Sequence, residues 1–144
     1  MNKIDCRVEQ VKWQDMESHL RRIRTIVFIE EQNVPEEMEW DECDEICTHV
    51  IVEINGAYVA TGRLLETGQI GRMAVLKSYR QMGVGSKILK KLLFVAESMG
   101  IKTVFLHSQL DAIGFYKKFS FEEEGNIFDD AGIPHRKMKK ALIN

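Results

Sequence analysis

One junction constrains the fold of this chain more than any other: a strand, a glycine-containing loop and a long helix follow one another. Residues 69–75 (Gln-Ile-Gly-Arg-Met-Ala-Val) read as the strand, and residues 80–85 (Arg-Gln-Met-Gly-Val-Gly) read as the loop. Apolar residues then recur at helical spacing, so a helix is predicted to begin at Gly85. These residues are Val84, Ile88, Leu92, Val95 and Met99. Unpaired backbone N–H groups and the helix dipole make such a junction an anion site.

A pyrophosphate is the anion that suits this loop, because glycines let it approach the backbone closely. The predicted ligands are the loop residues themselves: Arg80, Gln81, Gly83, Val84, Gly85 and Ser86. The spacing fits neither a nucleoside-triphosphate loop, which needs Lys and Ser/Thr after the second glycine, nor G-x-G-x-x-G, because Ile88 replaces the third glycine.

The loop resembles the acyl-CoA loop of the GNAT (Gcn5-related) N-acetyltransferase superfamily, whose pattern is Q/R-x-x-G-x-G/A. Residues 109–121 resemble the second signature of that superfamily, N-x-x-A-x-x-F-Y-x-x-x-G-F, with Ser120 in place of the usual glycine. Because this position follows a short helix and precedes a strand, a C-terminal cap with positive φ is expected at Ser120. Residues 27–35, the Trp40-Asp41 pair and residues 132–135 are similar to a bacterial subgroup of small, mostly uncharacterised acetyltransferases. The resemblance covers roughly residues 20–140.

The pattern along the chain predicts an α+β fold, in which helices flank a mixed, mostly antiparallel central sheet as an α/β/α sandwich. The expected element order is β-α-β-β-β-α-β-α-β-β over one domain, residues 1–144. A first strand over residues 4–12 precedes a helix capped by Asp15, which ends before Pro35. Residues 36–45 are expected to form an acidic loop.

The second half of the chain has clearer signals. Asn55-Gly56 predicts a hairpin between strands 49–54 and 57–65. The long helix is expected to end at Met99-Gly100, with glycine at the C-terminal cap. A short strand at 103–106, a short helix at 111–119 and a strand pair at 121–128 and 136–142 complete the prediction.

The resemblance also implies roles for individual residues. The backbone of Met73, Ala74 and Val75 would bind pantetheine as an added strand and polarise the thioester, although plain strand packing explains these apolar residues equally well. Tyr116 falls at the position of the general acid of the superfamily, and an ordinary phenol is protonated at neutral pH. Gln109 replaces the usual asparagine that contacts pantetheine.

The general base is left open between several groups. The candidates are Glu30, Glu31, His107 and His135, or a chain of water molecules. Histidine is attractive because its ordinary pKa lies near neutrality.

Two cysteines and a histidine, Cys43, Cys47 and His49, raise the question of a zinc site. Three ligands at this spacing lack a fourth and match no structural zinc pattern, so free cysteines and no metal are expected.

Composition predicts a cytoplasmic globular protein that is a monomer or homodimer. No apolar run approaches the roughly 20 residues that span a bilayer, and an apolar signal-peptide core is lacking. No basic run interleaved with aromatic residues suggests a nucleic-acid partner.

Residues 1–45 carry thirteen acids and six bases, whereas residues 46–144 carry nine acids and fourteen bases. An acidic first third would suit a cationic acceptor, although solvated surface charge explains it equally well.

The resulting expectation is an enzyme that moves an acetyl group from acetyl-CoA, as cosubstrate, to a primary amine of a small molecule or peptide. Direct transfer in a ternary complex is expected, because no nucleophilic cysteine lies beside the loop. The alternative is a non-catalytic acyl-CoA-binding or regulatory module on the same fold. The presence of Tyr116 favours the enzyme.

Overall fold

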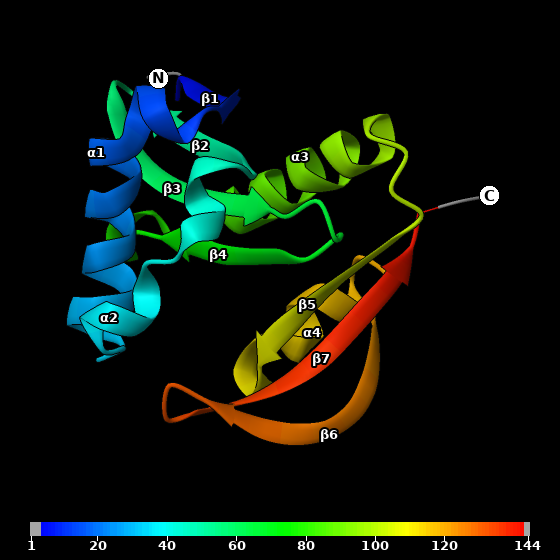
Figure 1. The fold of residues 1–144 in the computed structure, drawn as a ribbon. Helices are drawn as coiled ribbons and strands as arrows, with labels where there is room; N and C mark the ends of the chain where they lie inside the picture. The colour runs from blue at the N-terminus through cyan, green and yellow to red at the C-terminus, as the bar shows by residue number, and fades with distance from the viewer. Residues whose placement is uncertain (1–3, 143–144) are drawn as a thin grey trace.

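A computed structural model describes residues 4–142 of the chain. The elements follow the predicted order, with short additional helices (Figure 1). They are β1 (Cys6–Val11), α1 (Trp13–Arg24), a π-helical segment (Thr25–Glu31), α2 (Glu36–Glu39), β2 (Thr48–Ile54), β3 (Ala57–Leu64), β4 (Ile70–Val75), α3 (Val84–Ser98), β5 (Thr103–Gln109), α4 (Ile113–Lys117), β6 (Glu122–Asp130) and β7 (Ile133–Ala141). Within the described range, no helix is both long and apolar enough to cross a membrane.

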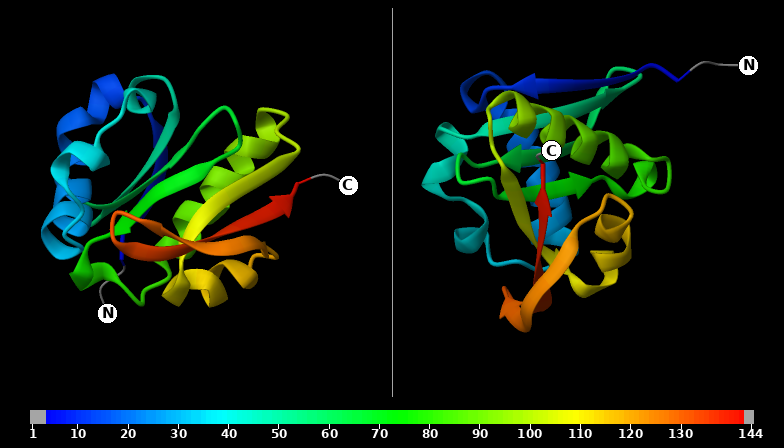
Figure 2. Two further views of the ribbon diagram at one scale, coloured as in Figure 1. Left: turned by 60° about the horizontal axis from the view of Figure 1, so that its bottom comes forward. Right: turned by 90° about the vertical axis from the view of Figure 1, so that its right-hand side faces the viewer.

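Strands β1 to β4 form an antiparallel sheet in chain order, and the two views of Figure 2 show this sheet between α1 and α3. Alternation along β2 explains the layering, because successive side chains point to opposite faces. Val50 and Val52 pack in the core beneath α3, while Ile51 packs with Trp13 and Leu20 of α1. The predicted mixed sheet flanked by helices is thereby confirmed.

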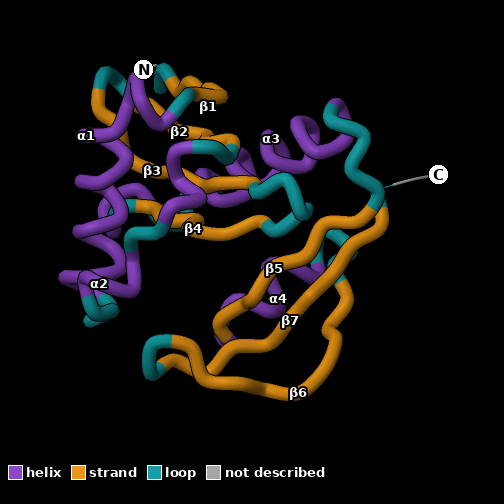
Figure 3. Tube along the Cα trace, viewed as in Figure 1, coloured by secondary structure: helices purple, strands orange, loops and turns teal. Residues whose placement is uncertain are grey.

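Strands β5, β7 and β6 form a second antiparallel sheet in that order (Figure 3). The two sheets meet at one parallel bridge between Gln69 and Phe105, just before β4 and near the start of β5. Beyond the bridge β4 and β5 diverge toward their carboxyl ends, as Figure 1 shows. Among the described residues, β4 therefore pairs with β3 on one edge and has no strand partner on the other.

A β-bulge interrupts the pairing of β4 with β3, near the point where β4 and β5 begin to diverge. Thr61 pairs with Ala74 but Arg63 pairs with Gly71, so β4 carries one extra residue between these pairs. Arg72 lies there with a φ of 51°, a left-handed conformation that non-glycine residues rarely adopt. A bulge bends its strand and redirects its side chains. The extra residue in β4 therefore accounts for the unusual backbone of Arg72, at the point where β4 and β5 begin to diverge.

Several local predictions are confirmed. Asn55 and Gly56 both have positive φ, as a type I′ hairpin turn requires. Helix α3 ends at Ser98 with Met99 as its C-terminal cap, and Gly100 follows with a φ of 77°. Ser120 has a φ of 69°, so the chain keeps the backbone conformation of the usual glycine without the glycine.

Three boundary predictions are wrong. Asp15 does not cap the first helix, because α1 begins at Trp13 with Lys12 as its N-terminal cap. Residues 36–45 are not simply a loop, since they contain α2 and a 3-10 turn over Glu42–Glu45. The last hairpin turns at Ala131-Gly132, so Ile133 to His135 belong to β7 and not to a connecting loop.

Candidate active site

The predicted anion loop leaves the start of α3 open. Gly83 is the N-terminal cap with a φ of 78°, and no side chain caps the helix. The first backbone hydrogen bond of the helix is donated by the Lys87 N–H to the Gly83 carbonyl, at 3.2 Å. Helix geometry leaves the N–H groups of the preceding turn, Val84 to Ser86, without intrahelical acceptors. The residues that carry these groups line a cavity, here called the loop cavity. Its full lining is Val75, Tyr79, Arg80, Gln81, Gly83, Val84, Gly85, Ser86 and Phe115.

A second cavity of about 270 Å³ lies where β4 and β5 diverge, and is here called the slot cavity. It collects five of the predicted site residues from four separate parts of the chain: Met73, His107, Gln109, Tyr116 and His135. Ala74, by contrast, packs into the core beneath α1, so only its backbone is available to a ligand. Successive side chains of a strand point to opposite faces, so the side chain of Ala74 points away from the face that Met73 and Val75 present.

Tyr116 is held at the slot cavity by α4. Its hydroxyl donates to the Met73 sulfur at 3.6 Å, and its ring packs edge-on against Phe121. Burial raises the pKa of Tyr116 to about 12. The phenol therefore keeps its proton at neutral pH, as a general acid must.

His107 and His135 approach the same cavity from β5 and β7, on either side of Phe128. His135 is nearly buried, and its Nδ1 lies 2.7 Å from the Ile133 carbonyl oxygen. A carbonyl only accepts, so Nδ1 carries the proton and Nε2 keeps the lone pair. His107 is more exposed than His135, and partial desolvation of its ring is the main cause of its lowered pKa.

Glu31 and Arg80, both predicted site residues, bind each other. The guanidinium donates to both carboxylate oxygens at 2.6 Å, and Nε donates to the Val75 carbonyl at 2.8 Å. The hydrogen bond from Arg80 lowers the pKa of Glu31, which makes this carboxylate a weaker base than histidine at neutral pH.

Gln109 binds a residue that the sequence did not single out. Its Nε2 donates to the Gln32 side-chain oxygen at 2.9 Å. Gln32 follows the π-helical segment and lines the slot cavity together with Phe28. Helical segments with this wider hydrogen-bonding pattern are uncommon and often lie at functional sites.

The acidic stretch 36–45 is largely a structural element. Three of its seven acids bind three arginines that come from α1, β3 and β4; the six residues are Glu39, Asp41, Asp44, Arg24, Arg63 and Arg72. Hydrogen bonds from Arg63 lower the pKa of Asp41 to about 2. The network fastens the segment over β4, with Arg72 donating to the Glu39 carbonyl at 3.0 Å.

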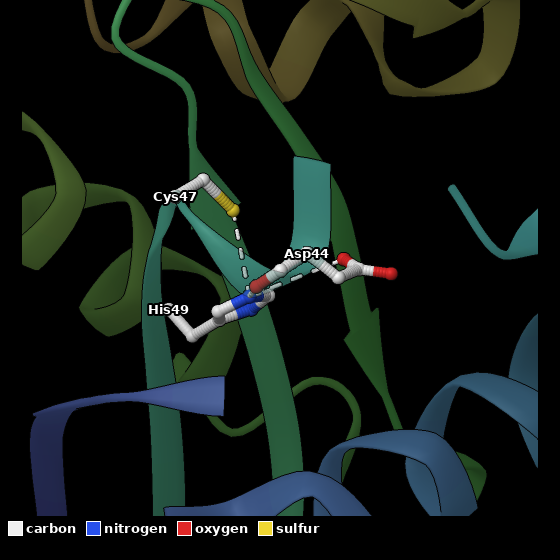
Figure 4. Close-up of side chains that lie close together, drawn as sticks. All are labelled: Asp44, Cys47 and His49. Atoms are coloured by element: carbon white, nitrogen blue, oxygen red, sulfur yellow. Dashed lines mark hydrogen bonds and ion pairs between the residues drawn. The ribbon is translucent and has the colours of Figure 1, made fainter. Parts of the chain in front are cut away.

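The suspected zinc ligands form a different group from the one expected. Asp44, Cys47 and His49 lie together, with potential ligand atoms within 4.8 Å of one another (Figure 4). His49 Nε2 lies 2.8 Å from the Asp44 carbonyl oxygen, so this nitrogen carries a proton and has no lone pair for a metal. Arg24 and Arg63 both donate to Oδ1 of Asp44, while Oδ2 is buried and has no hydrogen-bond partner among the described residues. The two guanidinium charges beside this carboxylate would repel a metal cation. The arrangement fits a structural junction better than a metal site.

Several residues that line the slot cavity were not predicted as site residues. Among them are Phe28, Gln32, Arg72 and Asp130. Their residue types are ordinary for a helix end, a strand and a hairpin, so only tertiary contacts distinguish them.

Comparison with known proteins places this chain in a family. A family model described as an acetyltransferase (GNAT) domain matches residues 6–142. The uncharacterised N-acetyltransferase YjcF of Bacillus subtilis is 40% identical over 125 residues, which cover 82% of this chain and 87% of the relative.

Two solved structures share the fold. An acyl-CoA N-acyltransferase from Pseudomonas aeruginosa superposes with a TM-score of 0.83 at 25% identity, covering 96% of this chain and 100% of the other. The ElaA protein of Escherichia coli superposes with a TM-score of 0.84 at 26% identity, covering 93% and 99% respectively.

Proposed function

The chain belongs to the GNAT acetyltransferase family, and on that premise we propose that it transfers an acetyl group from acetyl-CoA to a primary amine. The unpaired edge of β4 is the observation that carries the proposal. It runs from the slot cavity at Met73 to the loop cavity at Val75. An extended pantetheine arm can add to such an edge as a strand, while the free amides at the start of α3 bind the pyrophosphate.

The proposed transfer is direct. The amine lone pair attacks the thioester carbonyl carbon, the new C–N bond forms and the C–S bond breaks. His135 Nε2 takes the proton that the amine loses, directly or through water, because the Ile133 carbonyl keeps Nδ1 protonated. Tyr116 gives its proton to the departing thiolate. Backbone N–H groups on the free edge of β4 stabilise the oxyanion.

A covalent acetyl-cysteine is not favoured. Burial raises the pKa of Cys47 to about 11, so this thiol is a poor nucleophile at neutral pH. Within residues 4–142, none of the three cysteines lines the slot cavity or the loop cavity.

The proposed acceptor is a small amine bound in the slot cavity. The carboxylates that pair with arginines supply little attraction for a cation, and Glu39 is the only acid of the stretch 36–45 that lines the cavity. Asp130 also lines it and has no ion-pair partner among the described residues. A preference for cationic amines therefore rests on Asp130 and not on the acidic stretch as a whole.

Thiol release from acetyl-CoA, measured with a panel of cationic, neutral and anionic amines, tests the proposal. Tyr116→Phe should lower turnover by roughly 10²- to 10⁴-fold, the usual effect of one positioned acid, and leave CoA affinity unchanged. Tyr58→Phe is the matched control, since Tyr58 packs on His19 of α1. The pKa of Tyr116, about 12, predicts no loss of acid catalysis between pH 6 and 10.

The same assay separates the alternative function. CoA binding without thiol release for any amine would favour a non-catalytic acyl-CoA-binding module. Equal turnover of Tyr116→Phe and the unmodified enzyme, under conditions where chemistry limits the rate, would remove Tyr116 from the mechanism.

A further inference from the structure

The end of the π-helical segment touches both arms of the opening between β4 and β5. Glu31 binds Arg80, which also holds the carbonyl of Val75, the last residue of β4. The next residue, Gln32, binds Gln109, the last residue of β5. Two consecutive side chains thus connect the carboxyl ends of two strands that have no hydrogen bonds to each other there.

Arg80 makes three hydrogen bonds within this connection. Its Nε and both terminal nitrogens donate within the protein, and the two bonds to Glu31 form a planar fork. A fork of this kind fixes the guanidinium orientation as well as its position. These bonds use three of the five N–H groups of the guanidinium, and Glu31 also neutralises its charge, so a phosphate would have to compete with Glu31 for Arg80.

We propose that Glu31 and Gln32 form a clasp that sets the distance between the carboxyl ends of β4 and β5, and that Arg80 is a positioning residue of this clasp and not a phosphate ligand. The opening between these two strand ends is here called the acyl-CoA slot. The inference rests on the proposed function, because that function places the pantetheine arm of acyl-CoA in this opening. Phosphate binding is left to the backbone amides at the start of α3.

Binding measurements separate the clasp from direct phosphate contact. Calorimetry would follow CoA and adenosine 3′,5′-bisphosphate, which lacks the pantetheine arm, in Glu31→Gln, Arg80→Gln and the double variant. The clasp predicts that either single change weakens CoA binding by about three- to ten-fold, in line with a partly exposed ion pair that also orients its neighbours. It predicts little change for the bisphosphate, and no further loss in the double variant.

Direct phosphate contact predicts the opposite pattern. Arg80→Gln would then weaken both ligands, whereas Glu31→Gln would release Arg80 and tighten both. That result would overturn the inference. Glu17→Gln is a matched control, because Glu17 forms a comparably exposed ion pair with Arg21 on α1 at 2.7 Å.

Gln32→Ala tests the other arm by kinetics. The KM for acetyl-CoA should rise several-fold while kcat falls less, because the slot is loosened and the reacting groups remain. Gln14→Ala is the control, since Gln14 makes a similar 3.0 Å side-chain bond to the Glu45 carbonyl away from both cavities. An unchanged KM in folded Gln32→Ala would refute the clasp. If the unmodified protein binds no CoA, the proposed function fails first, which is a distinguishable result.

Discussion

Replacing Ser120 by glycine should stabilise this protein, although glycine usually destabilises a folded chain. Ser120 has a φ of 69° and an exposed side chain that makes no side-chain hydrogen bond among those in the described residues. It lies at the C-terminal end of α4, where its N–H donates to the Lys117 carbonyl at 3.0 Å and the N–H of Phe121 donates to the Tyr116 carbonyl at 3.3 Å. These two bonds, with Phe121 packed on Tyr116, form a Schellman motif.

The magnitude follows from two opposing effects. A left-handed backbone costs a non-glycine residue about 1–2 kcal/mol. Glycine removes that strain but adds about 0.4–1 kcal/mol of conformational entropy to the unfolded chain. The net stabilisation is up to about 1 kcal/mol, which for a domain of this size raises the melting midpoint by about 2–4 °C.

Thermal denaturation followed by circular dichroism measures the effect. Ser18→Gly is the matched control, because Ser18 is an exposed residue inside α1 and should lose about 0.5–1 kcal/mol on the same substitution. Activity should be unchanged in Ser120→Gly, since the bonds that place Tyr116 come from the backbone. A lower midpoint for Ser120→Gly would show that this cap is not strained and would weaken the argument for how Tyr116 is placed.

Two further predictions concern the anion loop and acid stability. Gly85→Val should nearly abolish CoA binding in calorimetry while the protein stays folded, because a β-carbon at Gly85 meets only Phe115, at 3.6 Å, and a branched side chain would block the phosphate; unchanged affinity would exclude this loop. Burial lowers the pKa of His49, so folding keeps this ring neutral, and its contribution to stability is present above the unfolded pKa of about 6.5 and is lost as pH falls below it. His49→Gln should therefore flatten the fall of the melting midpoint from pH 7 to pH 5, with His19→Gln as control, and an unaltered slope would contradict this reasoning.

Much of the fold was predictable because its signals are local. The Asn55-Gly56 turn, the glycine after α3 and the positive φ at Ser120 all depend on backbone preferences within a few residues. The errors were also local: Asp15 resembles a cap, but the chain starts α1 two residues earlier, where Trp13 can be buried under the helix.

The candidate site was predictable only in part. Motif spacing indicated Tyr116 and the loop residues, which the structure places at the two cavities. The ion pairs of the acidic stretch could not be predicted, because a sequence shows the number of charges and not their partners. Three of its seven carboxylates meet Arg24, Arg63 and Arg72, which lie between 15 and 33 residues away along the chain.

The sequence by itself determined the order of elements, the position of the predicted anion loop and the positive φ at Asn55, Gly56 and Ser120, since each depends on neighbours in the chain. The positive φ of Arg72 and of Gln81 was not predicted. Tertiary structure alone decided that Arg80 binds Glu31, 49 residues away, and that Gln109 binds Gln32, 77 residues away. Such pairs form because two strands diverge and a helix end happens to span the opening. Residue type and spacing do not indicate how far apart the two strand ends lie in the fold. The orientation of each side chain at this site is therefore a property of the folded chain.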